Sequence, residues 1–279
     1  MSEKLTEAVR SDLIQAIKSD KIKLPTLPEV AIQIRNEAKN PDVTASRLSK
    51  VISQDVGLSA RLIKVANSPL MRGSKTIEGL QMAISRIGVA YAGNLATGIA
   101  MQQMYQATSP GVDAKMREIW SRSTEVAGIA YILTKHYTRL RADEASLAGL
   151  VHRIGALPIL TYLEEQPKLN ENPKAIAFLL KQLEGEIGEL ILKTWDFPEG
   201  LVHIPSQYTN FKRESEQTDY IDVVMVANLQ SHLGTDHPYT KLNWSEFPAF
   251  ERLGLNPEAE EQEAEDISAE MEAAMAMFD

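Results

Sequence analysis

The chain has 279 residues, with 29 Lys and Arg against 38 Asp and Glu, no cysteine and a net charge of −9. Nine of the acids and none of the bases follow residue 252, so residues 1–252 carry 29 of each sign. This neutral body lacks the basic excess that drives non-specific nucleic-acid binding. The lack of cysteine excludes disulfides, thiolate nucleophiles and Cys-ligated zinc.

The chain shows no targeting or membrane signal. No apolar run approaches the roughly 18–20 residues that a membrane-spanning helix needs. The first residues, MSEKLTEAVRSDLIQ, mix acids and bases and contain no apolar signal core. We therefore expect a cytoplasmic protein with no membrane insertion.

An all-α fold is expected, because apolar residues recur at three- and four-residue spacing and alternating patterns are rare. The predicted helices, in chain order, cover about 4–19, 28–39, 44–54, 56–67, 77–86, 89–106, 113–138, 143–152, 155–164, 172–184, 186–195, 198–207 and 217–234. A shorter helix is expected at about 244–253, and the tail after Pro257 can also be helical.

Several predicted boundaries have a local cause. Pro28 and Pro198 suit the first turn of a helix, where the missing N–H would be unpaired anyway. Asp55 can cap the helix VGLSARLIKVAN by accepting hydrogen bonds from its free amides. Ser109-Pro110-Gly111 is the strongest break in the middle of the chain.

That break divides the body, residues 1–252, into two predicted helical subdomains at about 1–108 and 112–252. The remaining residues, 253–279, form an acidic tail biased toward Glu, Ala and Met. One interpretation of the tail is a solvated or frayed helix. The other is an amphipathic interaction segment that docks on this chain or on a partner, because one helical stripe would hold Ile267, Met271, Ala274, Met275 and Phe278.

Familiar catalytic motifs are missing. The sequence contains no nucleotide-binding glycine loop, no nucleophile elbow and no H-E-x-x-H. No two of its histidines have the i, i+4 spacing that places both on one metal, so each is interpreted as a structural or surface residue: His136, His152, His203, His232 and His237. The acidic pairs Asp143-Glu144 and Glu164-Glu165 are interpreted as helix-terminal or solvated pairs.

Five segments, in order, resemble motifs of the HDOD family of bacterial all-helical domains, which are related to the metal-dependent HD phosphohydrolases. They are LPTLPEV at 24–30, SKVISQDVGLSARLIKVANSP at 49–69, MAISRIG at 82–88, GLVHRIGALPIL at 149–160 and EGEIGELILKTWDFPEGLV at 184–202. Together they cover roughly 24–235. The resemblance implies a multi-helix HDOD domain that belongs to bacterial signal transduction.

The motif residues also have scaffold interpretations. The set comprises Leu24, Pro25, Leu27, Pro28, Asp55, Asn67, Ser68, Gly88, Trp195 and Pro198. Asn67 can adopt a left-handed conformation at a helix end or cap the exposed carbonyls. Gly88 is expected to end one helix and let the next pack closely. Trp195 and Phe197-Pro198 are expected to form a packed corner.

The metal-binding positions of HD enzymes are largely replaced when the chain is registered on the flanking motifs. The resemblance places Arg122 after Trp120 where a first histidine is expected, and His152-Arg153 at the His-Asp pair. The later metal positions correspond to Glu184, Tyr208, Thr209 and Asn228. Guanidinium groups cannot lose their proton and would repel a dication. We therefore expect no metal, no cofactor and no catalytic residue.

These replacements suggest that Arg122 or Arg153 stands in for the metal ion and pairs with Glu184, with His152 nearby. The competing interpretation has both arginines pointing into solvent.

The resemblance favours a non-catalytic regulatory module that acts through protein–protein contacts. The implied partners are signalling proteins of the two-component or cyclic-di-nucleotide type. The alternative is a divergent HD-type metal-dependent phosphohydrolase that uses His152 and Glu184. A third hypothesis is an anionic ligand, such as a nucleotide, held by Arg122 and Arg153. The sequence predicts no oligomeric state.

Overall fold

A computed structural model describes residues 11, 14, 15, 24–71, 73–166, 172–256 and 269–275. Over these residues the chain forms helices and no strand, which confirms the all-α prediction. The helix predicted over 4–19 lies almost wholly outside the described residues, as does the tail at 257–268 and 276–279.

Helices connected by short turns make up the fold. The first group is α2 (Glu29–Ala38), α3 (Ala45–Ile52), α4 (Val56–Ala66), α5 (Leu80–Ile87), α6 (Val89–Ala100) and the 3-10 turn η1 (Met101–Met104). The second is α7 (Pro110–Tyr137), α8 (Ala142–Val151), α9 (Ala156–Glu164) and α11 (Pro173–Thr194). The third is α12 (Glu199–Val202), α13 (Ile204–Gln207), α14 (Tyr220–Gln230), η2 (Pro238–Lys241), η3 (Trp244–Glu246) and α15 (Pro248–Leu253).

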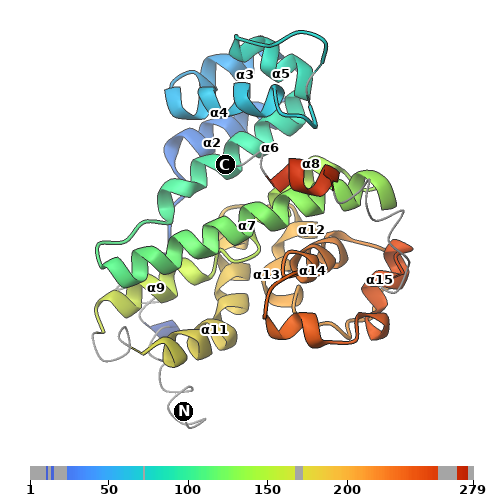
Figure 1. The fold of residues 1–279 in the computed structure, drawn as a ribbon. Helices are drawn as coiled ribbons and strands as arrows, with labels where there is room; N and C mark the ends of the chain where they lie inside the picture. The colour runs from blue at the N-terminus through green and yellow to red at the C-terminus, as the bar shows by residue number, and fades with distance from the viewer. Residues whose placement is uncertain are drawn as a thin grey trace.

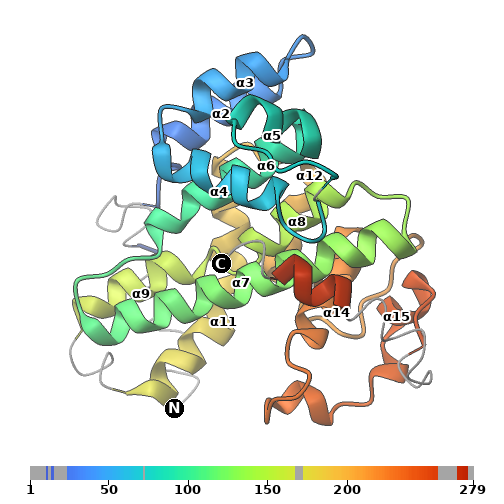
Figure 2. The ribbon, with the colours of Figure 1, turned by 45° about the horizontal axis from the view of Figure 1, so that its top comes forward.

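The long helix α7 separates the other helices into groups. Figures 1 and 2 show α2 to α6 on one side of α7, and Figure 1 shows α9 and α11 below one end of α7 and α14 and α15 below the other. Helix α8 packs against α6, α7 and α14, and so connects the first group to the rest.

One continuous hydrophobic cluster runs from Leu27 to Ala274 across the break at 109–111. The division into two subdomains stays a prediction. The stretch Ala142–Glu164 is the one segment of the described residues whose length and mean hydropathy of 1.3 would suit a membrane span, and 83% of its most apolar window is buried inside the protein. Its apolar character is therefore accounted for by the core. The sequence pattern did not single out this segment as a long apolar run.

Side-chain caps explain where several helices begin. The Asp55 side chain accepts a hydrogen bond from the amide of Leu58 at 2.9 Å, as predicted. Ser109 accepts from the amide of Val112, and Pro110 occupies the first position of α7. The predicted break at 109–111 is therefore the N-terminal cap of the longest helix.

Some of the predicted helix boundaries are wrong, including that of the helix expected at 244–253, which is the 3-10 turn η3 followed by α15. The helices expected at 172–184 and 186–195 are one helix, α11, which runs unbroken through Gly185. A Cβ on Gly185 would lie 2.9 Å from the Cα of Ser206, so this glycine allows α13 to approach α11 and does not end a helix. The helix expected over 198–207 is two short ones, α12 and α13, because His203 interrupts it.

The structure distinguishes between the roles that the sequence predicts for Asn67 and for Gly88. Asn67 has a right-handed backbone (φ −102°), and its amide donates to the carbonyls of Ile63 and Ile77 at 3.1 and 2.7 Å. It is therefore the carbonyl-capping alternative that holds. Gly88 ends α5 at φ +91°, a conformation that L side chains rarely adopt. No atom of the described residues would lie within 4 Å of an added Cβ there, so close packing is not its role.

The opening motif meets the Trp195 corner. The indole N–H of Trp195 donates to the carbonyl of Pro25 at 2.9 Å, and the ring centroids of Trp195 and Phe197 lie 6.1 Å apart. The Arg35 guanidinium lies over the Phe197 ring and donates to the carbonyls of Trp195 and Asp196 at 2.8 and 2.9 Å. Residues far apart in the sequence therefore tie α2 to the end of α11.

The glycine contact between the start of α9 and α11 gives the first testable prediction. A Cβ at Gly155 would lie 1.9 Å from the carbonyl oxygen of Glu184. We expect Gly155→Ala to lower the free energy of unfolding by about 1–3 kcal/mol or more, because the added methyl group overpacks the contact and forces the two backbones apart. Gly111→Ala is the matched control, since an added Cβ there meets open space within a helix. It should be neutral or stabilising by up to about 1 kcal/mol. Equal urea midpoints for the two variants would contradict the expected contact.

Candidate functional site

The predicted site residues come from five parts of the fold. Arg122 lies on α7, His152 ends α8, Arg153 follows it, and Glu184 lies in the middle of α11. Tyr208 follows α13 and Asn228 is buried in α14. Thr209 is exposed. Whether these positions correspond to the metal positions of related enzymes stays a prediction.

Arg153 and Glu184 form a bidentate ion pair at the centre of this group. Arg153 Nε and Nη2 donate to Glu184 Oε1 and Oε2 at 2.7 and 2.8 Å. The side chains are 20% and 8% exposed, respectively, so the pair is largely shielded from water. Burial opposes the charge of Arg153, but the attraction and hydrogen bonds of Glu184 outweigh it and raise the pKa of the guanidinium.

Arg122 has different partners. Its Nη1 donates to Glu125 Oε2 and to the carbonyl of Ser231, both at 2.6 Å. Of the two arginines proposed to pair with Glu184, Arg153 is therefore the one that does so. Neither arginine simply points into solvent.

His152 is fully buried beside the ion pair. Its Nδ1 lies 2.6 Å from the carbonyl oxygen of Gly149, and a carbonyl can only accept, so the proton is on Nδ1. The Nε2 atom then carries a lone pair and has no hydrogen-bond partner among the described residues. The Tyr208 ring packs edge-on against the imidazole at 4.8 Å. Burial, with the charges of Arg153 and His232, lowers the pKa of His152 to about 3 despite the Gly149 contact.

The structure also joins two histidines that the sequence treats separately. The rings of His232 and His237 stack at 3.7 Å with an angle of 13°. Burial, the neighbouring ring and the charges of Arg122 and Arg153 lower the pKa of His232 to about 4. The pKa of His237 is lowered by burial and by the same two arginines. Five-residue spacing gives no metal-binding signal, and it is the turn through Gly234 (φ +74°) that brings the rings together.

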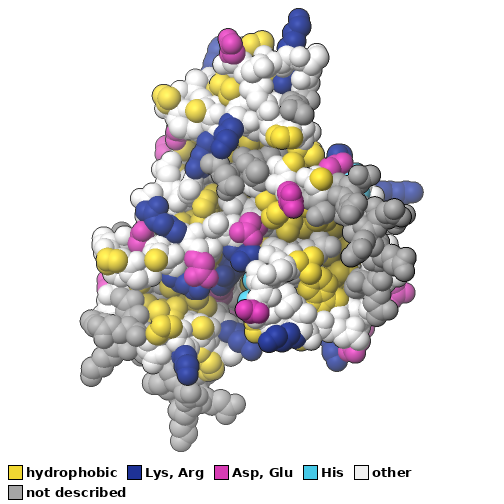
Figure 3. All heavy atoms as spheres, viewed as in Figure 1, with side chains coloured by type: hydrophobic (Ala, Val, Ile, Leu, Met, Phe, Trp, Pro, Cys, Tyr) yellow, Lys and Arg dark blue, Asp and Glu magenta, His cyan; other side chains and the backbone are white. Residues whose placement is uncertain are grey.

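The site lies next to a hollow in the surface. Figure 3 shows this hollow between α11 and the side formed by α13 and α14, with histidine side chains in its wall and Lys or Arg at its rim. With both arginines paired to carboxylates and the histidines neutral, the group has little net charge. The anionic ligand proposed from the sequence stays a prediction.

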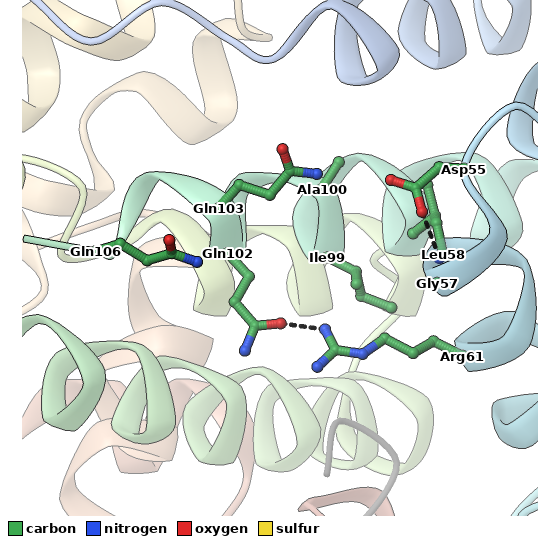
Figure 4. A pocket seen from close by; sticks show the side chains of 9 residues that line it. All are labelled: Asp55, Gly57, Leu58, Arg61, Ile99, Ala100, Gln102, Gln103 and Gln106. Atoms are coloured by element: carbon green, nitrogen blue, oxygen red, sulfur yellow. Dashed lines mark hydrogen bonds between the residues drawn. The ribbon is translucent and has the colours of Figure 1, made fainter.

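A second, separate cavity of about 180 Å³ lies between the start of α4 and the end of α6. Figure 4 shows Arg61 reaching Gln102, with the carboxamides of Gln103 and Gln106 along one wall. The lining offers hydrogen bonds to polar groups. Its one carboxylate, Asp55, already caps α4. Among the described lining residues, no histidine and no second carboxylate accompanies Asp55.

Comparison with known proteins identifies the family. The HDOD domain model matches residues 24–211, and the chain belongs to the HDOD family. An uncharacterized protein of Treponema pallidum (strain Nichols) is 26% identical over 235 residues, 78% of this chain and 44% of that protein. Cyclic di-GMP phosphodiesterase CdgJ of Vibrio cholerae is 23% identical over 165 residues, 58% of this chain and 36% of its own length. The chain spans less than half the length of both relatives.

Solved structures share the fold. A crystal structure named "Putative metal-dependent phosphohydrolase" from Shewanella amazonensis SB2B has a TM-score of 0.86 and 29% identity, covering 98% of this chain and 99% of that one. An HDOD domain protein with unknown function from Geobacter sulfurreducens has a TM-score of 0.67 and 19% identity, covering 97% of this chain and 96% of that one.

The buried ion pair gives a stability prediction. Glu184→Ala should lower the free energy of unfolding by about 3–5 kcal/mol, because it leaves the Arg153 charge buried and unpaired. The double variant Arg153→Met/Glu184→Leu removes both charges and should recover most of that loss. Urea unfolding monitored by circular dichroism measures both. A double variant less stable than Glu184→Ala would contradict this account.

The buried His152 gives a pH prediction. Its pKa of about 3 lies below the ordinary value of 6.5, so the unfolded chain binds a proton that the folded chain does not. The stability that this histidine contributes is complete above about pH 6.5 and is lost as the pH falls toward 3. We expect His152→Gln to flatten the dependence by up to about 1.4 kcal/mol per pH unit between pH 6 and 4.

The control for this experiment is Val151→Ala, a buried neighbour that does not titrate. It should lower stability by a similar amount at each pH and keep the slope of the unsubstituted chain. Parallel curves for His152→Gln and the unsubstituted chain would show that His152 is not buried neutral.

Proposed function

We propose that this HDOD domain is a non-catalytic regulatory module of bacterial signal transduction that acts by binding protein partners. The observation that carries the proposal is the bidentate contact of Arg153 with Glu184. At the position where the resemblance places the aspartate of a His-Asp pair, this chain has a guanidinium that occupies both oxygens of the nearest carboxylate.

The donor set does not suit a metal ion. Arg153 cannot lose its proton, and both Glu184 oxygens already accept hydrogen bonds from it. His152 Nε2 is an unpartnered imidazole donor, the neighbouring His232 stacks on His237, and Asn228 offers only a carboxamide. Among the described residues no three His, Asp or Glu side chains converge to hold an ion. A dinuclear site would need several such ligands together.

The partners that fit this proposal are signalling proteins of the two-component or cyclic-di-nucleotide type. The resemblance to HDOD domains supports this assignment, and so does the name of the Vibrio relative. Binding would work by selection: a partner state that fits the helical surface better is favoured, and the equilibrium shifts toward it.

The alternative function is a divergent phosphohydrolase. The names of the Vibrio and Shewanella relatives favour it, as does the unpartnered Nε2 of His152. In that case Arg153 would have to leave Glu184 before the carboxylate could bind an ion.

Metal content and hydrolysis separate the two functions. The full chain, produced with Mn²⁺ and Fe²⁺ supplied, is analysed by mass spectrometry for metals and assayed on p-nitrophenyl phosphate and cyclic di-GMP. We expect far less than one metal ion per chain and hydrolysis no faster than that of His152→Ala. Protein partners captured from the native host should remain bound in EDTA.

The proposal fails if metal is stoichiometric and hydrolysis is measurable, with both lost in His152→Ala. It also fails if EDTA releases every captured partner, because binding would then depend on an ion.

A further inference from the structure

Residues 269–275 of the tail form a helical segment that lies against α7, as both ribbon views show. The contact centres on two small residues. A Cβ on Gly128 would lie 2.7 Å from the backbone of Ala274 and Met275, and Ala274 is fully buried. The missing side chain at Gly128 therefore forms a groove into which only a small residue of the docked segment fits.

Apolar and charged side chains on either side of Ala274 also hold the segment against the body of the protein. Met271 and Met275 pack against the hydrophobic core on either side of Ala274. Glu270 Oε2 lies 3.0 Å from both Lys135 Nζ and His136 Nε2. Because Ala274 meets Gly128 while Glu270 meets Lys135, the segment runs antiparallel to α7. Glu272 points away and is exposed.

The groove therefore selects a pattern: an acid, an apolar residue directly after it, a small residue four positions after it and another apolar residue next. Most of the stability of a helix in a protein comes from the packing of its apolar face, so the contacts with α7 are expected to stabilise the helical conformation of this segment. The ion pair between Glu270 and Lys135 is half-exposed, and such a pair contributes little to the stability of the contact. Such a segment can be displaced by another helix of the same chemistry.

We propose that the groove along α7 at Gly128 and Lys135 is the docking site for an acidic amphipathic helix of a partner protein. Residues 269–275 occupy it within the same chain and compete with that partner. This inference rests on the proposed binding function and names its surface. Tethering gives the internal segment a high effective concentration, so it suppresses partners that match the pattern weakly.

The test uses full-length chains and a fluorescein-labelled peptide of residues 264–279 as the partner mimic. Ala274→Arg in the chain is too large for the groove and should free it without altering α7. We expect the peptide to bind this variant at least ten times more tightly than the unsubstituted chain, by fluorescence anisotropy. Glu272→Arg introduces the same side chain on the exposed face, with a charge change of two units in place of one, and this variant should bind the peptide as weakly as the unsubstituted chain does.

Two further changes locate the peptide. Gly128→Val, combined with Ala274→Arg, should abolish binding because a side chain fills the groove. Lys135→Glu in the same background should weaken binding, and a peptide carrying Glu270→Lys should restore it. This charge exchange keeps the proposal testable if the Gly128 variant does not fold.

Equal peptide affinity for Ala274→Arg and the unsubstituted chain would overturn the proposal, as would binding that ignores the charge exchange. A dimer of the unsubstituted chain in light scattering, lost on Gly128→Val, would also overturn it by assigning the groove to a second copy. If hydrolysis is found but the peptide results hold, the proposed function fails and the groove stands.

Discussion

The ion pair between Arg153 and Glu184 is the interaction on which the interior of this domain depends. It joins the turn after α8 to the middle of α11, where Gly155 brings the two backbones into contact. A buried charge is tolerated only with a partner, so this turn and this helix must be positioned together. His152, the residue before Arg153, is buried here with the Tyr208 ring packed edge-on against it.

Much of the scaffold could be predicted from sequence because its causes are local. The helical periodicity, the Asp55 cap and the turn at Gly88 depend on neighbouring residues. The pairing of Arg153 with Glu184 could be proposed because motif registration placed both at one site. The same registration did not distinguish Arg153 from Arg122, since only the fold shows that Arg153 reaches Glu184 while Arg122 reaches the carbonyl of Ser231.

Other features depend on contacts between distant residues and could not be predicted. Gly185 is a residue type that often ends a helix, but α11 continues through it. The glycine is needed there because α13 packs closely against α11 at this point. His232 and His237 stack because of the path of a turn and not because of their spacing. The amphipathic stripe of the tail was consistent with docking on this chain or on a partner. Residues 269–275 dock on this chain, and they do so against Gly128 of α7. Nothing in the sequence around Gly128 indicates this role.

The clamp formed by Arg35 has a consequence for synthesis. Arg35 donates to carbonyls 160 and 161 residues further along the chain, and Lys39 reaches the Asp196 side chain at 2.9 Å. At about 5–20 residues per second, roughly 8–30 s pass between the translation of Arg35 and that of its acceptors. During that interval the face of α2 that will meet the Trp195 corner has no native partner. The nascent chain therefore exposes its first motif to chaperones and to misfolding until α11 and the Trp195 corner have been translated.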